Sequence, residues 1–490
     1  MRAILILALT AACAGGPDRS AASDGGPPDE WFPKDTALFI SVRDMPGLRA
    51  RLARTALWRD PALQLLLPTS VPAAGRLWDL VAGEWSLGVL PAAGGKAADV
   101  LLMCDVGDNG PRVRELLLQA REGRRYAVTR HRGVPVMVEV APSDPQRRSC
   151  WHLEGRRFVY ASDYGLMRRR LDKEGEPLAR HADYRRVRAK FGRGDAFAYL
   201  AFDLASPDVR RYAGSRLDAL GLASVRAVGG MLDLRDDGLA ARVHLLAPGP
   251  KRGVLKLAAS GNRKLEPPAF LPATTSACLT FAVHWSTVWR EFVRTGDALG
   301  QATSRAEEQI REATRAAGLD FDKDILGSLG DELTVLELEG RVLLLEVRHR
   351  KRFAKVLDAL AANTKAKEAT YEGVLVRGLS DGTLIALLDE TLLIAQSAAD
   401  VRTLIDRAGP SVRETVAYGE ASAALPARRI LAWFYNPAVS RRAPGSLEAL
   451  ARRHVTAAGG AVRNVGDGLS AAFFVGLRPA EAVTRVVSAR

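Results

Sequence analysis

The side chains of this 490-residue chain that could carry out chemistry include seven histidines and several pairs of adjacent carboxylates. None of the histidines belongs to a His-Glu-x-x-His motif or to a close pair, the spacings with which enzymes often hold zinc. The seven are His131, His152, His181, His244, His284, His349 and His454. Because His152 and His244 alternate with other residues in predicted strands, we expect them at surface or half-buried positions rather than as ligands. We therefore predict no metal site and no cofactor.

Gly94-Gly95-Lys96 is similar to the end of a phosphate-binding loop. The first glycine of such a loop is replaced by Leu90, and Ala97 stands where a serine or threonine would bind magnesium. The segment is better explained as a flexible connection between two strands.

Three pairs of adjacent carboxylates would suit general acid–base catalysis if the fold brought suitable partners to them. They are Asp236-Asp237, Asp331-Glu332 and Asp389-Glu390. Each lies beside a predicted strand, and the Asp-Gly and Gly-Asp sequences among them favour tight turns. We expect these pairs to form turns, and we identify no catalytic residue. The sequence thus predicts that the protein is not an enzyme.

The N-terminus contains the most specific local signal in the chain. Met1-Arg2 is followed by an apolar stretch, Ala3–Leu9, and then by small residues before Cys13. This order is typical of a secretory signal peptide, and it is similar to a bacterial lipobox, in which the cysteine is lipidated. Thr10 departs from the lipobox, which usually has leucine there, so conventional cleavage around Ala12-Cys13-Ala14 is the alternative.

Residues 1–13 are thus predicted to be a signal peptide with a lipobox-like end, lipidated at Cys13. Residues 14–30 are rich in Gly, Pro, Ser and Asp, a composition typical of a disordered tether. The longest later apolar stretch, Leu333–Val347, is interrupted by charged residues and is too short to span a bilayer. We expect an exported protein of the cell envelope, in the periplasm or at the outer surface, attached to a membrane by lipid.

The composition is that of a folded, basic protein, with 47% hydrophobic and 26% charged residues and a formal net charge of +14. The basic residues are scattered among acidic ones, and no homeodomain, zinc-finger or RNP pattern occurs. We therefore expect no nucleic-acid partner. A solvated surface that rests close to anionic lipid explains the positive charge better.

The cysteines beyond Cys13 are Cys104, Cys150 and Cys278. In an oxidising periplasm Cys104 and Cys150 are able to form a disulfide. Buried free thiols on strands are the alternative, which the wide spacing of the three residues favours.

Strand-like and helical segments recur in the same order in the two halves of the chain, about 240 residues apart. For example, Pro33 precedes an extended run in the first half as Pro272 does in the second, and Gly133 corresponds to Gly373. About nine features recur in this way, which favours a duplication over chance matches. The predicted domains are a first repeat over 31–248, a polar linker over 249–268 and a second repeat over 269–490.

Each half contains about eight predicted strands and three or four predicted helices. Strands joined by short turns pair antiparallel, and amphipathic helices bury a face of the resulting sheet. The predicted fold class is therefore α+β, with two tandem copies of a mostly antiparallel sheet covered by helices. Ser162 and Ser397 each follow a predicted hairpin, and we expect each to cap the next helix.

Several of these elements resemble a known family. Pro33–Val42 followed by a short helix, Gly330-Asp331-Glu332 before a strand, and Tyr371-x-Gly373-Val374 are similar to recurring elements of the bacterial domain-of-unknown-function family numbered 3352. The resemblance covers nearly the whole folded part, although the first half departs from it at Gly83-Glu84. It implies an exported or lipid-anchored protein and implies no activity, cofactor or catalytic residue.

These observations together predict a non-enzymatic binding or scaffold protein of the envelope. One alternative is a periplasmic carrier or chaperone for lipids or lipoproteins, which would need a deep apolar cavity. Another is an enzyme with an unrecognised site, which would need polar groups clustered in a cleft. The expected partners are a membrane, through the N-terminal lipid, and either a protein or an apolar ligand.

Overall fold

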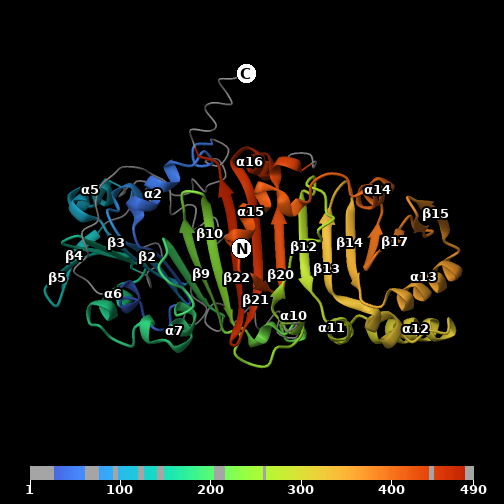
Figure 1. Ribbon diagram of the computed structural model, residues 1–490. Helices are drawn as coiled ribbons and strands as arrows, with labels where there is room; N and C mark the ends of the chain where they lie inside the picture. Colours follow the sequence, from blue (N-terminus) through green and yellow to red (C-terminus); the bar gives the residue numbers. More distant parts are fainter. Residues whose placement is uncertain are drawn as a thin grey trace, which may run out of the picture. The chain divides into compact units, whose positions relative to one another are not determined.

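The chain forms two compact units, each a mixture of helices and antiparallel strands (Figure 1). The computed structural model describes residues 27–60, 77–91, 98–119, 126–140, 148–202, 216–257, 261–440 and 446–479. Described residues within 1–209, 225–246 and 477–490 make up unit 1, and those within 210–224 and 247–476 make up unit 2. The predicted combination of helices with a large antiparallel sheet is confirmed. No helix in these ranges is long and apolar enough to cross a membrane.

The described strands of unit 1 form an antiparallel sheet with the order β4-β5-β6-β7-β3-β2-β1-β8-β9-β10. Their bounds are β1 Leu38–Val42, β2 Trp85–Leu90, β3 Asp99–Asp105, β4 Tyr126–His131, β5 Val134–Glu139, β6 Cys150–Glu154, β7 Arg157–Ala161, β8 Ala196–Ala201, β9 Ala227–Leu234 and β10 Gly238–Leu246. Short apolar runs rich in aromatic and branched residues suit this half-buried, pleated surface. β1 lies between β2 and β8, with Phe39 opposite Gly88 on one side and Tyr199 on the other.

The described strands of unit 2 form a sheet with the order β15-β16-β17-β18-β14-β13-β12-β20-β21. Their bounds are β12 Ala277–Ala282, β13 Leu329–Glu337, β14 Arg341–Val347, β15 Lys367–Tyr371, β16 Val374–Gly378, β17 Leu384–Leu388, β18 Thr391–Ala395, β20 Leu431–Tyr435 and β21 Val455–Val465, followed in the chain by β22 Gly468–Leu477. A separate short pair joins β11, Arg263–Lys264, to β19, Arg428–Arg429.

The two sheets arrange their chain segments in the same way. Read from β15 to β21, the order in unit 2 matches that of unit 1 from β4 to β9, strand by strand. Main-chain bonds outside the sheets recur as well. The amide of Leu178 donates to the carbonyl of Phe32 at 2.7 Å, and that of Val412 donates to the carbonyl of Leu271 at 2.8 Å.

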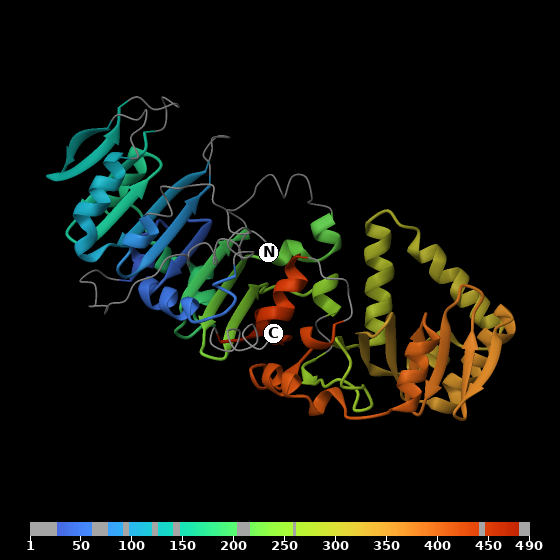
Figure 2. The ribbon, with the colours of Figure 1, turned by 90° about the horizontal axis from the view of Figure 1, so that it is seen from above.

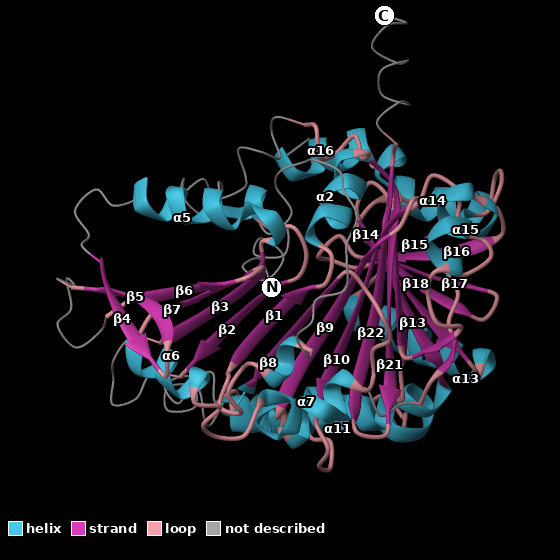
Figure 3. Ribbon diagram, turned by 90° about the vertical axis from the view of Figure 1, so that its left-hand side faces the viewer, coloured by secondary structure: helices cyan, strands magenta, loops and turns pink. Residues whose placement is uncertain are grey.

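Helices cover the sheet of unit 1 on both faces. α2 (Met45–Ala53) and α5 (Gly110–Gln119) lie on one side, and α6 (Tyr164–Leu171) and α7 (Ala182–Arg188) lie on the other (Figure 3). Leu166 and Met167 of α6 are fully buried in the aromatic-rich core on their side. The expectation of a helix-covered antiparallel sheet thus holds for this unit, with helices on two faces.

Unit 2 has helices against both faces too. Its described helices are α10 Val254–Leu257, α11 Trp285–Ala298, α12 Thr303–Ala316, α13 Arg350–Thr364, α14 Ala398–Asp406, α15 Val416–Ala423 and α16 Ser446–His454. Leu404 of α14 belongs to the same buried cluster as Leu344 of β14, whereas Leu357 of α13 belongs to a second cluster with Leu345, the next residue along that strand. Because neighbouring side chains of a strand point to opposite faces, the two helices lie on opposite sides of the sheet.

Two hairpin turns explain the paired glycines seen in the sequence. Arg132 and Gly133 join β4 to β5 with φ of 49° and 84°, and Glu372 and Gly373 join β15 to β16 with φ of 46° and 76°. Positive φ at both central residues is the type I′ geometry, whose twist matches that of the strands. Glycine suits the second position because it adopts positive φ without steric cost.

One of the two predicted helix caps is confirmed and the other is wrong. Ser397 is the N-cap of α14 and its side chain accepts a hydrogen bond from the amide of Asp400. Ser162 does not cap α6, because the N-cap is Asp163, whose carboxylate accepts from Leu166. The hydroxyl of Ser162 instead accepts from the amide of Val100, which fixes the hairpin to β3.

Candidate functional site

Three segments singled out in the sequence lie outside the described residues. They are the predicted signal peptide 1–13 with the lipidation site Cys13, residues 14–26 of the predicted tether, and Gly94-Gly95-Lys96. Lipidation of Cys13 therefore stays a prediction.

The surface or half-buried positions predicted for His152 and His244 are wrong, since the two residues are 4% and 0% exposed. The ring of His152 lies 3.1 Å from the carbonyl oxygen of Pro135 through Nδ1 and 3.4 Å from the Glu154 carboxylate through Nε2. The period-2 pattern does not reveal burial here, because helices cover both faces of the sheet. No group of three or more His, Cys, Asp or Glu within the described ranges is placed to hold a metal ion.

Two of the three acidic pairs form turns as expected. Asp236-Asp237 lies between β9 and β10, and Asp389-Glu390 lies between β17 and β18. Asp331-Glu332 is a correction, because both residues belong to strand β13. Asp331 is ion-paired with Arg263 and Arg348, which accounts for its charge without a catalytic role.

One Gly-x-Ser-x-Gly pattern occurs in the chain, at Gly378–Gly382. In hydrolases this pattern forms a sharp turn between a strand and a helix that presents the serine. Here it lies between the antiparallel strands β16 and β17, with Gly382 at a φ of 86°. The segment is a hairpin connection.

The three described cysteines are free and buried. The structure thus favours free thiols over a disulfide between Cys104 and Cys150. Burial raises the pKa of Cys150 to about 12 and that of Cys278 to about 12, and it raises the pKa of Cys104 further. Thiols that stay protonated are poor nucleophiles.

Glu84 is the most perturbed carboxyl group of unit 1. It precedes β2, and its carbonyl accepts a hydrogen bond from the amide of Asp105 at 2.8 Å. Its pKa is raised to about 7, chiefly because burial disfavours the charged form, and the charges of Asp29 and Asp105 add to this effect. The positive charges of Arg43 and Arg157 oppose it.

We expect the Glu84→Gln variant to be more stable than the parent protein at pH 8, by on the order of 1 kcal/mol once partial exposure is discounted. The pKa of Glu84 in the folded state lies above its ordinary value of 4.5, so the folded state binds the proton more tightly. The free energy of unfolding of the parent therefore falls as the pH rises from about 4.5 to about 7. Denaturant unfolding at several pH values measures this slope, which the variant should lack. Glu174→Gln, at an exposed position, is the control, and parallel pH profiles of E84Q and the parent would contradict the assignment.

The helical hairpin α11–α12 is the most distinctive part of unit 2. In the chain it connects β12 to β13, which pair directly in the sheet. Its two helices leave the sheet and meet at a turn (yellow-green in Figure 2). Asp297, at the end of α11, accepts hydrogen bonds from the amide and hydroxyl of Ser304 and from the hydroxyl of Thr303. These bonds hold the pKa of Asp297 down to about 2. A carboxylate at the start of α12 also suits the helix dipole, so the tip is firmly closed.

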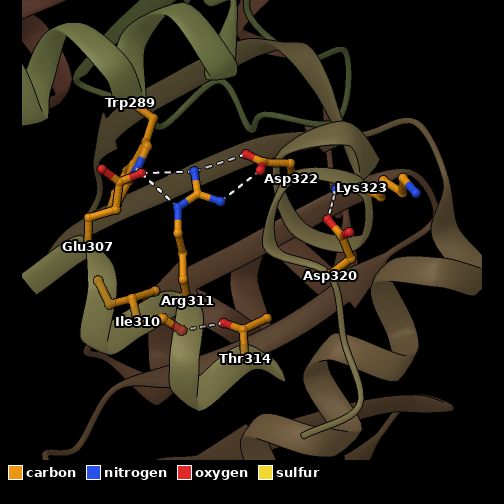
Figure 4. A network of polar contacts seen from close by, with 8 residues as sticks. All are labelled: Trp289, Glu307, Ile310, Arg311, Thr314, Asp320, Asp322 and Lys323. Atoms are coloured by element: carbon orange, nitrogen blue, oxygen red, sulfur yellow. Dashed lines mark hydrogen bonds and ion pairs between the residues drawn. The ribbon is translucent and has the colours of Figure 1, made fainter. Parts of the chain in front are cut away.

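A polar network ties the base of the hairpin to the following turn, the π-helical segment η7 (Phe321–Ile325) (Figure 4). The indole nitrogen of Trp289 donates to Glu307 at 3.0 Å, and Nε of Arg311 donates to the same oxygen at 2.8 Å. Arg311 also binds both carboxylate oxygens of Asp322, at 2.7 and 3.2 Å. The guanidinium lies over the ring of Phe321, which packs against Trp289. The hairpin therefore forms one rigid piece with its base.

One side of the hairpin is a polar groove of about 430 Å³. Its lining includes Arg290 and Asp297 from α11 and Ser304 and Arg311 from α12, each pair seven residues apart and so on one side of its helix. The carboxylates of the groove are committed to the tip and base contacts described above. The polar contacts among the residues that line the groove thus hold the two helices of the hairpin together.

The other side of the hairpin is apolar and exposed. Phe292 is 57% exposed, and Leu299, seven residues later on the same side of α11, is 40% exposed. Ile310 of α12 is also 40% exposed, with the exposed Ala306 and Ala313 one turn to either side. This surface, defined by Phe292, Leu299, Ile310 and the two alanines, is called the apolar face below. In the sequence, the only sign of the apolar face is that apolar and charged residues recur at helical spacing along α11 and α12.

Comparison with known proteins gives a family match over part of the chain and no activity. Residues 251–471 match the model of a family described as protein of unknown function (DUF3352). No curated protein matches the sequence significantly. Two solved structures, crystal forms III and I of TP0453, show 9% and 10% identity, cover 50% of this chain and 91% and 90% of their own, and have TM-scores of 0.31 and 0.30. Scores of that size establish no shared fold.

The matched segment contains β12, the α11–α12 hairpin, the strands from β13 to β21 and the start of β22. It also contains Gly330-Asp331-Glu332 and Tyr371-x-Gly373-Val374, two of the three elements that resemble the family, whereas the third, Pro33–Val42, lies outside it. Over residues 251–471, the predicted resemblance to the DUF3352 family, whose function is unknown, is therefore confirmed.

Proposed function

We propose that this chain is an exported, lipid-anchored protein of the cell envelope that acts by binding rather than by catalysis. The observation that supports a binding role is the apolar face, where Phe292 is 57% exposed on a hairpin that polar contacts hold rigid. Clustered exposed apolar side chains on a soluble protein are typical of an interaction surface. Export and anchoring rest on the order of charged, apolar and small residues before Cys13.

We further propose that the two units are copies of one ancestral unit, over 31–248 and 269–490. The support is the matching strand order of the two sheets and the recurrence of the same main-chain bonds at Leu178 and Val412. Type I′ turns at Gly133 and Gly373 add to it. Independent folds would not be expected to share connectivity, turns and main-chain contacts together.

The carrier alternative receives less support. A lipid ligand needs a cavity of roughly 300 Å³ or more. The interior hollow beside Cys278 and Phe434 in unit 2 has a volume of about 10 Å³. The hollow of about 580 Å³ beside α5, lined by Pro111, Leu118 and Leu153 among others, is an open surface groove.

Mass spectrometry of the membrane-extracted protein tests the anchor. We expect the mature chain to begin at Cys13 and to carry the mass of attached acyl chains, because the lipobox-like order directs lipidation there. The Cys13→Ala variant should lose this mass and move to the soluble fraction of the envelope. An unmodified N-terminus at residue 14 or beyond in the parent protein would refute the lipoprotein assignment.

A further inference from the structure

The apolar face of the α11–α12 hairpin has a simple composition. Phe292, Leu299 and Ile310 project from it, and the exposed Ala306 and Ala313 lie one turn to either side of Ile310. The charged residues of α12 that line the groove are on the opposite side of the helix. Burying this face in an apolar medium would therefore remove no charge from water.

α11 has the residue pattern of a helix that lies in a membrane interface. Phe292 and Leu299 occupy one side, while Arg290 and Arg294 occupy the other. Arg294 is ion-paired with Glu291, which also binds Lys256. No carboxylate in the described part of the chain pairs with Arg290 or with Arg305 of α12.

Arg290 and Arg305, which pair with no carboxylate of the described residues, favour an anionic lipid surface over another protein as the partner. An interface with another protein normally contains about one hydrogen bond per 100–200 Å², and the apolar face offers few groups to make them. A lipid surface demands no such groups, and anionic headgroups would attract Arg290, Arg305 and a chain whose net charge is +14.

We propose that the apolar face of the α11–α12 hairpin inserts into the surface of a bilayer containing anionic lipid, with Arg290 and Arg305 at the headgroups. This inference rests on the proposed function, because a body anchored through Cys13 is already held near a membrane. A tethered second contact forms at high effective concentration, so even a weak interaction would keep the body against the bilayer.

Vesicle binding by the full chain with Cys13→Ala, which has no acyl anchor, tests the inference. The vesicles contain phosphatidylcholine alone or phosphatidylcholine with about one third phosphatidylglycerol. We expect binding to the anionic vesicles, and a fall of at least about tenfold in the partition coefficient for Phe292→Ser with Leu299→Ser. Val416→Ser, at a 77% exposed position of α15, is the matched control and should bind like the parent. Arg290→Gln and Arg305→Gln should each weaken binding about fivefold, on anionic vesicles only.

Placement of the face at the membrane is measured separately with a polarity-sensitive dye on Gln301→Cys, at the tip of the hairpin. The described cysteines are buried and should not react. We expect the dye emission to shift to the blue with anionic vesicles, and circular dichroism should show that every variant is folded.

Equal vesicle binding by the serine variants and Val416→Ser, or no binding by the parent, would overturn the inference. So would a loss of self-association in the serine variants without any loss of vesicle binding, which would identify a second copy of the chain as the partner. None of these results changes the mass of the N-terminus, so a failure here is distinguishable from a failure of the lipoprotein assignment.

Discussion

Replacement of Phe39 by alanine is expected to lower the free energy of unfolding of unit 1 by about 3–5 kcal/mol. Phe39, the second residue of β1, is 1% exposed. Its ring meets Phe32 edge-on at 5.0 Å, Tyr184 at 6.0 Å and Phe197 at 6.5 Å between centroids. The variant loses the burial of the ring and leaves a cavity among aromatic groups that cannot close around it.

Denaturant unfolding monitored by tryptophan fluorescence measures this change. Val128→Ala is the control, because Val128 is also on a strand of unit 1 but is 63% exposed. We expect a change of less than about 0.5 kcal/mol for the control. A similar small change for Phe39→Ala would show that the aromatic cluster is not the centre of this core.

The second large effect is expected for Gly221→Ala in unit 2. Gly221 has a φ of +75°, and a β-carbon there would lie 1.9 Å from the carbonyl oxygen of Arg252. The obstacle is main chain, and the amide of Val254 donates to the carbonyl of Leu220 at 3.0 Å beside it. The two segments would have to separate, which combines backbone strain with overpacking and costs about 3–5 kcal/mol.

Gly318→Ala separates the two contributions. Gly318 has almost the same φ, +74°, but a β-carbon there would meet nothing within 4 Å. Its replacement should cost only the backbone strain, about 1 kcal/mol. The difference between the two variants, measured by denaturant unfolding, gives the cost of the collision. Equal losses for both would mean that the segments around Gly221 and Arg252 separate freely.

The main strands and their turns could be predicted from the sequence because the signals are local. The hairpin predicted before Ser397 agrees with β17 and β18, since apolar runs bounded by turn residues leave few alternatives. The exchange of Ser162 for Asp163 as a helix cap shows the limit of such rules. Both residues are good caps, and the pairing of Ser162 with β3, far along the chain, decides between them.

The candidate site was harder to predict, for a physical reason. The helical spacing of Trp289, Phe292 and Leu299 predicts an amphipathic helix, and the usual expectation is that its apolar side is buried. Whether that side is covered depends on which other elements reach it. The burial of His152 and His244 was missed for the same reason. Helices from elsewhere in the chain cover the second face of the sheet, and the local pattern does not show this.

The buried cysteines have a consequence for how the two units can be observed. Cys104 and Cys150 lie in unit 1 and Cys278 lies in unit 2, and each reacts with a thiol reagent only when its surroundings open. The rate of labelling at each cysteine thus reports how often the unit that contains it opens. The natural chain therefore contains a built-in probe in each half, and the stability of one can be followed while the other stays closed.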